Sequence, residues 1–309
     1  MLTRCELIVI TSLWFFLIAG INQTEASQPI PGEVVSTYIV PDVFTSLNGL
    51  AWDGKYLWGV NYDKGRRSGI HGYLPGFLRR FFNSDILLAE EGKAYKMSFN
   101  QGVNKNELHI LISLSLNMAK MEGVAHDGIN TLYVGPRLSG SRTSAQVVGI
   151  DTKTTSTVRT YTDYLWPDLL THGNYKDPDG IAHDGTNIYW VVNADHTADV
   201  SKAGVQVIGP TGKIIKRFWL PDEKPNDVTY AGGYLIYKPA SANVIKLIDV
   251  NIVQDGGSAI AAEEISITGA IITDHWGTAH DGNSYLYIAQ DKPGSMLWKL
   301  YLPLPYNKN

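Results

Sequence analysis

Four segments of the chain share one pattern of small, apolar and polar positions. Each reads Gly-(Leu/Val/Ile/Thr)-Ala-(His/Trp)-Asp-Gly, and a run of apolar and aromatic residues follows each Asp-Gly pair. A fifth copy is degenerate. The copies are Leu47–Gly54, Met121–Gly128, Pro178–Gly185, His275–Gly282 and, for the degenerate one, Pro225–Gly232. Recurrence of this kind indicates an internal structural repeat.

Each repeat predicts a β-hairpin. A short strand leads into a tight turn, where aspartate and glycine tolerate positive φ angles, and a strand rich in aromatic and β-branched residues returns. The leading glycine and the alanine two residues later lie on one face of the first strand, because side chains alternate between faces. Small residues at both positions allow a neighbouring sheet to approach closely.

The spacing of the repeats is typical of the blades of a β-propeller. The leading position recurs at intervals of 74, 57, 47 and 50 residues. If the first interval contains one eroded unit, the mean is about 46 residues, the length of a four-stranded blade. That unit would lie near residues 94–115, where Lys93–Phe99 and Leu108–Ile112 read as strands. The sequence therefore predicts one all-β domain over residues 27–309, a six-bladed propeller, with five blades and a large insertion as the alternative.

The two ends of the chain predict how the ring closes. After its hairpin, the last repeat has one further strand, Met296–Leu302, before Pro303. The segment Val34–Val40, ahead of the first repeat, supplies a spare strand. Pairing of these two strands would seal the ring and remove an unpaired sheet edge.

The first 26 residues predict a secretory signal peptide. Arg4 precedes Leu7–Ile21, fifteen residues without a charge, and the small residue Ala26 stands where cleavage is expected. The apolar run would span about 22 Å as a helix, less than the roughly 30 Å of a bilayer core, so a retained anchor is the weaker alternative. We expect a secreted or periplasmic protein without disulfides, because Cys5 is the only cysteine.

Composition and charge narrow the classes of function. Hydrophobic residues make up 44% and charged residues 18% of the chain, as in an ordinary globular domain. The net charge of −4 gives no basic surface for nucleic acid. The sequence contains no Gly-x-Ser-x-Gly elbow, no His-Glu-x-x-His motif and no phosphate-binding glycine loop. We expect a monomer, free of the membrane after cleavage, that recognises a small molecule, a sugar or a protein.

The position before the leading glycine is the candidate site. The innermost strands of a propeller converge on a central channel, and this position lies where each of them begins. It is polar in four copies, as Asn48, Glu122, Asp179 and Asn226. Two carboxylates and two amides on one axis suit Ca²⁺ or another divalent cation. Asparagine and aspartate are also ordinary turn residues, which is the alternative interpretation, but glutamate has no such preference.

The repeat resembles the broad six-bladed class that includes NHL-type propellers and the SMP-30/gluconolactonase/strictosidine-synthase-like group. In that group, glutamate, asparagine and aspartate from the inner ends of different blades hold a divalent metal. The resemblance implies that Glu122, Asp179 and Asn226–Asp227 are the matching positions. It also implies a lactonase or esterase, in which the metal polarises a carbonyl and acidifies a water, and Asp179 or His275 moves the proton.

Two functions therefore stay open. The favoured one is an exported binding or interaction module with a polar site in its channel that holds a divalent cation. The alternative is the metal-dependent lactonase or esterase. Residues 61–82 and 162–177, which are rich in loop-forming residues, are the expected recognition elements.

The repeat histidines predict packing and not metal binding. His126, His183 and His280 correspond to Trp52 and Tyr230 in the other copies. A position that accepts histidine, tryptophan or tyrosine alike is typical of aromatic contacts between blades.

Overall fold

The structure is a computed structural model that describes residues 28–41, 47–61, 92–101, 106–116, 118, 121–136, 145–163, 179–192, 203–222, 225–290 and 295–304. The strands all lie in one compact unit, Pro31–Asn309. The predicted signal peptide lies outside the described residues, as do nearly all residues of the two expected recognition elements. No described residue forms part of a helix that could cross a membrane.

Every strand among the described residues belongs to a group of four antiparallel neighbours, and these strands form five such groups. The first contains β2 (Leu47–Trp52), β3 (Leu57–Asn61), β4 (Gly92–Gln101) and β5 (Asn106–Leu116). The second contains β6 (Met121–His126), β7 (Thr131–Pro136), β8 (Ala145–Asp151) and β9 (Thr157–Asp163). The third contains β10 (Gly180–His183), β11 (Ile188–Val192), β12 (Gly204–Ile208) and β13 (Ile214–Trp219). The fourth contains β14 (Thr229–Ala231), β15 (Tyr234–Tyr237), β16 (Val244–Asp249) and β17 (Glu263–Ser266). The fifth contains β18 (His275–His280), β19 (Tyr285–Gln290), β20 (Met296–Tyr301) and β1 (Val34–Ile39).

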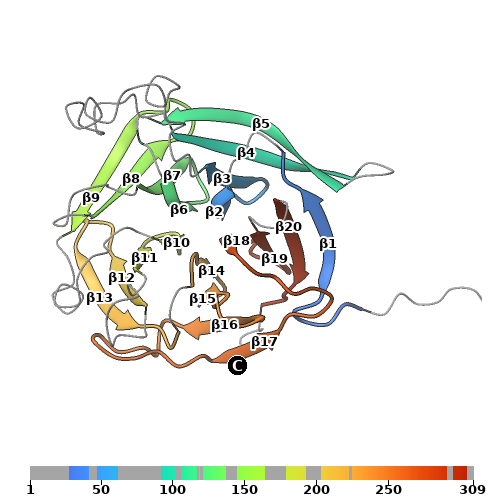
Figure 1. The fold of residues 1–309 in the computed structure, drawn as a ribbon. Coiled ribbons are helices and arrows are strands. Elements are labelled where there is room, and N and C mark those ends of the chain that lie inside the picture. Colours follow the sequence, from blue (N-terminus) through green and yellow to red (C-terminus); the bar gives the residue numbers. More distant parts are fainter. Residues whose placement is uncertain are drawn as a thin grey trace, which may run out of the picture. The chain divides into compact units, whose positions relative to one another are not determined.

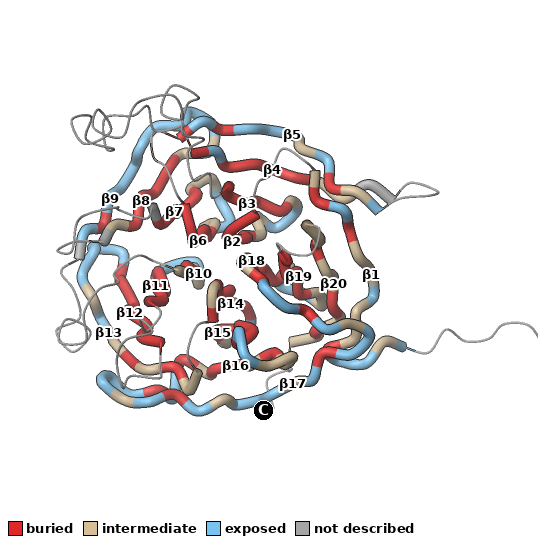
Figure 2. Tube along the Cα trace, in the orientation of Figure 1, coloured by how far each residue is buried: buried red, intermediate tan, exposed pale blue. Residues whose placement is uncertain are grey.

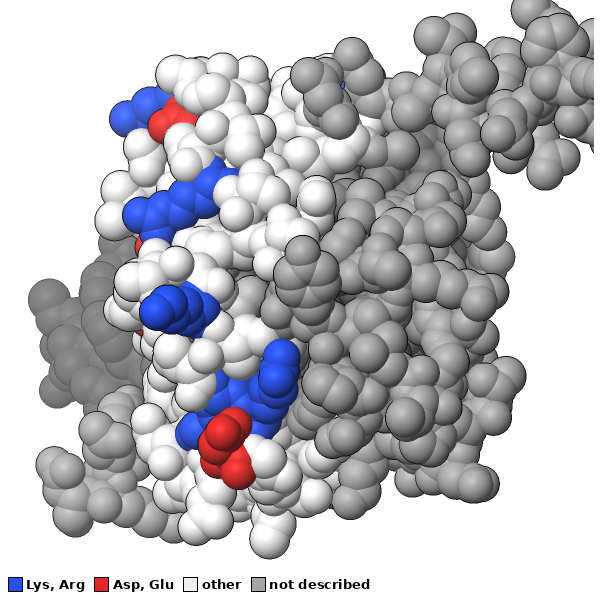
Figure 3. Space-filling model, turned by 90° about the vertical axis from the view of Figure 1, so that its left-hand side faces the viewer, with Lys and Arg blue, Asp and Glu red and all other residues white. Residues whose placement is uncertain are grey.

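The groups surround a central axis as the blades of a β-propeller, which confirms the predicted architecture (Figure 1). The innermost strands are β2, β6, β10, β14 and β18, and each pairs with the next strand of the chain to form the hairpin that the repeat predicts. Buried positions gather on the inner and middle strands, while the outermost strands carry most of the exposed ones (Figure 2). Basic side chains on the outer face in Figure 3 lie in separate spots with uncharged surface between them.

The number of blades among the described residues is five, which differs from the favoured prediction of six. Residues 94–115, assigned to an eroded unit, belong instead to β4 and β5. These strands extend the first blade outward, with Leu57 of β3 opposite Met97 of β4. A single parallel pair, Ile39 with Glu107, joins the first and fifth blades into one eight-stranded sheet. Residues 62–91, where the insertion of the five-blade alternative would fall, lie outside the described residues.

The ring closes as the sequence predicts. Strand β1 pairs antiparallel with β20, and Ile39 lies opposite Met296. The side chain of Tyr38 is buried in the same apolar cluster as Leu50 and Leu297, which belong to the first and fifth blades. The closing strand therefore supplies both backbone hydrogen bonds and a large apolar side chain to the junction.

The Asp-Gly pairs form the hairpin turns. Oδ1 of Asp127 accepts hydrogen bonds from the backbone N–H groups of Ile129, Asn130 and Thr131 at 2.8–2.9 Å. Burial alone would raise the pKa of Asp127, but these N–H donors outweigh it and lower the pKa. Gly128 has a φ of +79°, a conformation that a side chain would strain. The pair is thus conserved within the chain for turn geometry.

The aromatic position of the repeat packs between blades, as predicted. Four of the five rings stack on an aromatic ring of a neighbouring blade, in the pairs His126–Trp58, His183–Tyr133, Tyr230–Tyr189 and Trp52–Tyr287. The Nδ1 atoms of His126, His183 and His280 accept hydrogen bonds from the turn glycines at 2.9–3.0 Å. Burial lowers the pKa of all three imidazoles, so they are neutral packing groups.

Candidate functional site

The four polar positions of the predicted site lie at the same end of the innermost strands, which we call the start end of the channel. We call these four the start residues: Asn48, Glu122, Asp179 and Asn226. The first two are the second residues of β2 and β6, and the other two precede β10 and β14. The neighbouring inner strands touch at this level, because a Cβ added at Gly49 would lie 2.9 Å from the carbonyl oxygen of Glu122.

The start residues differ in burial. Asn48 is 3% exposed and Glu122 is 7% exposed, while Asp179 and Asn226 are half-buried. Buried polar groups of this kind need hydrogen bonds or ions to offset the loss of water. The start end of the channel therefore carries both buried and half-buried polar side chains.

The backbone at the start end is irregular. The pairing register shifts between Asn48 and Leu50, between Met121 and Gly123, and between His275 and Gly277. Each shift places an extra residue in the inner strand, and such bulges re-aim side chains near binding sites. Asn226 has a φ of +59°, rare for a residue with a side chain, and its Nδ2 donates to the carbonyl oxygen of His275 at 2.9 Å.

The donor set of the start residues fits a hard divalent cation in its chemistry. Carboxylate and amide oxygens are the ligands that Ca²⁺ prefers. Within the described ranges, no group of three or more histidine, cysteine, aspartate or glutamate residues is placed to hold a metal ion. A cation here would depend on the two amides as much as on Glu122 and Asp179, and it stays a prediction.

His275, the second candidate for proton transfer, has its ring held by the backbone. It is 1% exposed, and its Nε2 donates to the carbonyl oxygens of Lys238 at 2.9 Å and Pro225 at 3.2 Å. Burial, with a smaller contribution from the charge of Lys238, lowers the pKa of His275 to about 4. This geometry favours Asp179 over His275 as the group that could move a proton.

Lys238, beside His275, is a buried charge that the sequence did not single out. It follows β15 directly and is 1% exposed. Its Nζ donates to the carbonyl oxygens of Pro239 at 3.0 Å and Ala242 at 2.9 Å. Burial lowers the pKa of Lys238 to about 8. These two hydrogen bonds join Lys238 to the segment between β15 and β16 and hold the bend there.

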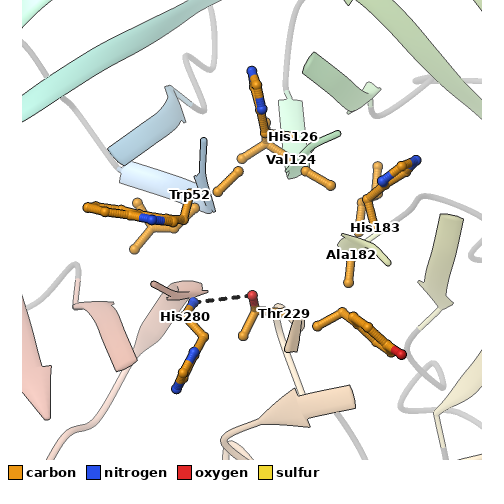
Figure 4. A pocket seen from close by; sticks show the side chains of 12 residues that line it. Trp52, Val124, His126, Ala182, His183, Thr229 and His280 are labelled. Atoms are coloured by element: carbon orange, nitrogen blue, oxygen red, sulfur yellow. Dashed lines mark hydrogen bonds between the residues drawn. The ribbon is translucent and has the colours of Figure 1, made fainter. Parts of the chain in front are cut away.

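A small cavity of about 50 Å³ lies at the opposite end of the inner strands, which we call the turn end. Twelve residues of the five inner strands line it, among them Trp52, His126, His183 and His280. Their rings point away from the cavity, so its wall is made largely of backbone and Cβ atoms (Figure 4). The N–H of His280 donates to Oγ1 of Thr229 at 3.2 Å across the cavity rim. The histidines therefore do not converge on a common ligand.

Comparisons with known proteins find a likeness in fold and no family. No family model matches the chain, and no curated protein matches it in sequence. The structure of a glutaminyl cyclase from Myxococcus xanthus is similar at 13% identity and a TM-score of 0.52, over 89% of this chain and 99% of that one.

Two other solved structures are less similar. The PQQ-bound aldose sugar dehydrogenase from Streptomyces coelicolor is 12% identical with a TM-score of 0.39, over 87% of this chain and 97% of that one. The Dos1 propeller is 11% identical with a TM-score of 0.37, over 84% of this chain and 60% of that one. At 13% identity, the likeness to the glutaminyl cyclase concerns the fold alone.

Proposed function

We propose that this chain is an exported β-propeller that binds a small polar ligand at the start end of its channel, where the start residues hold a divalent cation, Ca²⁺ before others. The observation that carries the proposal is their placement. Four successive inner strands present an oxygen-bearing side chain at the equivalent position, directly before the leading residue of each repeat. A turn preference explains the asparagines and the aspartate but leaves Glu122 unexplained.

The topology supports a site at this end. In each blade the first strand runs towards a tight turn, Asp-Gly in four copies and Ala-Gly in the fourth blade, and the second strand runs back. The connection from the second strand to the third therefore begins at the start end. Strand β3 ends at the start end with Asn61, and β4 begins there with Gly92. The connection between these two strands contains far more residues than a hairpin turn. Long connections at one end of a rigid scaffold are where recognition is usually found.

A bound cation would supply positive charge to orient an oxygen of the ligand. The chain's own residues would do the rest. Asn48 and Glu122, which are buried, would fix the cation from neighbouring blades, and the half-buried Asp179 and Asn226 would face the ligand.

Metal content and thermal unfolding test the proposal. We expect purified protein to hold about one Ca²⁺ and its melting temperature to rise when Ca²⁺ is added, because a ligand of the folded state stabilises it. Glu122→Gln should weaken Ca²⁺ binding by at least about tenfold. Glu263→Gln, on the exposed strand β17, is the matched control and should bind as the unaltered protein does. Absence of bound metal together with no thermal shift would overturn the proposal.

The second candidate function is a metal-dependent lactonase or esterase of the SMP-30/gluconolactonase-like kind. The observation that favours it is the proximity of two carboxylate-bearing strand starts. A Cβ added at Gly123, next to Glu122, would lie 3.1 Å from the carbonyl carbon of Gly180, next to Asp179. One carboxylate could bind a cation while the other accepts a proton from water.

A panel of lactones and aryl esters distinguishes the hydrolase from the binding module. The hydrolase requires turnover that disappears in excess chelator and in Asp179→Asn, while Ca²⁺ binding survives in that variant. Turnover that persists in chelator contradicts this second function. A binding module shows the thermal shift with Ca²⁺ and no turnover.

Export is the remaining part of the proposal. The amino-terminal sequence of protein recovered from outside the producing cell should begin near residue 27. Recovery of the chain only inside the cell, with residues 1–26 retained, would contradict it.

A further inference from the structure

One repeat places an acidic side chain where the other four have glycine. Asp227 stands at the leading position in the fourth blade, and its counterparts are Gly49, Gly123, Gly180 and Gly277. A Cβ added at Gly49, Gly123 or Gly180 would lie 2.9 Å from an atom of the next inner strand. The axis is therefore too narrow for a side chain in those three blades, and the fourth blade carries an acidic one.

Asp227 is fully buried, and its carboxylate links separate blades. Oδ2 accepts a hydrogen bond from the N–H of Thr278 in β18 at 2.6 Å and from the N–H of Leu50 in β2 at 3.2 Å. Burial raises the pKa of Asp227 well above its usual range, while the backbone N–H groups of Thr278 and Leu50 act in the opposite direction. Donors from the first and fifth blades thus meet on one oxygen of a side chain from the fourth blade.

These N–H donors are a product of the repeat. Both belong to the residue directly after the leading position, Leu50 in the first copy and Thr278 in the last. Within each hairpin, hydrogen-bonded residues alternate with residues whose N–H faces away from the partner strand. The N–H groups of Asp53 and Asp281 bond inside their own hairpins, so those of Leu50 and Thr278, an odd number of residues earlier, face the channel.

Converging backbone N–H groups make a binding site for an anion, because their partial positive charges add. We propose that the axis of this propeller is a carboxylate-binding site made of backbone N–H groups, and that Asp227 is its built-in ligand. The side chain closes the channel at this level. Asp227 then separates the start residues from the cavity at the turn end. A ligand bound at the start end both enters and leaves through the start end of the channel.

The second oxygen of Asp227 supports a site and not a simple packing role. Among the described residues, Oδ1 has no hydrogen-bond partner although it is fully buried. A buried polar atom without a partner is destabilising, so a residue with only a packing role would be apolar at this position. Oδ2 joins the first and fifth blades to the fourth, which an apolar side chain could not do.

Chemical rescue tests the proposal. Asp227→Ala keeps the Cβ that the backbone already accommodates and removes only the carboxylate, which leaves space for formate. We expect this variant to melt at a lower temperature than the unaltered protein, and formate to raise its melting temperature in a concentration-dependent manner at constant ionic strength. Chloride, which has one acceptor atom, should raise it less. The unaltered protein and Asp227→Asn, whose sites are filled, should show no shift with formate beyond that with chloride.

Gly185→Ala serves as a destabilised control, since this turn glycine has φ +94° and lies away from the axis. Equal effects of formate on Gly185→Ala and Asp227→Ala would overturn the proposal. If Asp227→Ala does not fold in plain buffer, its refolding yield in formate is compared with its yield in chloride at the same ionic strength. A higher yield in formate supports the site, and equal yields overturn it.

Discussion

The imidazole of His126 stacks on the indole of Trp58, with ring centroids 6.0 Å apart and planes inclined by 16°. His126 ends the inner strand of the second blade, and Trp58 lies on β3 of the first blade. Nδ1 of His126 also accepts the N–H of Gly128 at 2.9 Å, which fixes the ring as a neutral group. His126 thus connects the hairpin turn of the second blade to an aromatic side chain of the first blade.

The third blade offers a direct test of this packing role. His183 stacks on Tyr133 with centroids 5.0 Å apart, and Tyr230 makes the equivalent contact with Tyr189 one blade later. His183→Ala should lower the free energy of unfolding by about 2 kcal/mol through lost aromatic contact and burial. His183→Tyr should retain most of that free energy, because the repeat accepts tyrosine at this position. Urea unfolding curves measure both, and equal losses in the two variants would contradict a packing role.

Two glycines of one repeat should respond differently to the same added methyl group. A Cβ at Gly180 would lie 2.9 Å from Cα of Asp227, whereas a Cβ at Gly185 would meet nothing within 4 Å. Gly185→Ala should destabilise the protein by about 1 kcal/mol, since only its positive φ is strained. Gly180→Ala should cost about 3 kcal/mol or more, because backbone has to move. Gly185→Asn, which tolerates positive φ, should cost less than Gly185→Ala when chemical denaturation is measured.

Closure of the ring by β1 is expected to depend on one side chain. Tyr38 is 1% exposed and its ring lies 4.8 Å from that of Phe99 on β4, while its neighbour Ile39 is 52% exposed. Tyr38→Ala should lower the free energy of unfolding by about 3–5 kcal/mol, as for other buried aromatic residues. Ile39→Ala is the matched control and should change it by about 0.5 kcal/mol. Similar losses in the two variants would show that strand pairing, and not the buried ring, seals the junction.

Local sequence patterns predicted the parts of this fold that depend on local geometry. The Asp-Gly turns follow from the φ angle that glycine allows, and the pairing of β1 with β20 follows from a blade that lacks one strand. The blade count was harder to predict because outer strands carry no motif. Nothing in residues 94–115 tells whether two strands extend the first blade or begin another.

The polar groups at the axis show a different limit. In the sequence, Asp227 is one more acidic residue of a degenerate repeat and Lys238 is a lysine after a strand. Neither pattern indicates that the side chain is buried. Their burial depends on contacts with distant residues. Leu50, which donates to Asp227, lies 177 positions away. The one signal in the sequence was the aspartate that replaces glycine at the leading position. The start residue next to it, Asn226, was assigned to the polar site, and Asp227 was not.

The pH dependence of stability should report on the buried imidazole of His275. Its pKa is about 4 in the folded protein, because burial disfavours the charged ring, against 6.5 for an ordinary histidine. The unfolded chain therefore binds the proton more readily. The contribution of His275 to stability is complete above pH 6.5 and is lost as the pH falls towards 4. A shift of this size corresponds to about 3 kcal/mol.

The repeat histidines act in the same direction, since burial lowers the pKa of His126, His183 and His280 as well. The raised pKa of Asp227 acts in the opposite direction. Its contribution cancels when the unaltered protein is compared with His275→Asn, because both contain Asp227. Urea unfolding at pH 7.5 and pH 5, for the unaltered protein and for His275→Asn, isolates the contribution of His275. We expect the unaltered protein to lose more stability on acidification than His275→Asn does, because the variant has no proton to take up at this position. Equal losses would mean that the ring is already accessible to protons in the folded protein, and that its bonds to the carbonyl oxygens of Pro225 and Lys238 do not hold it.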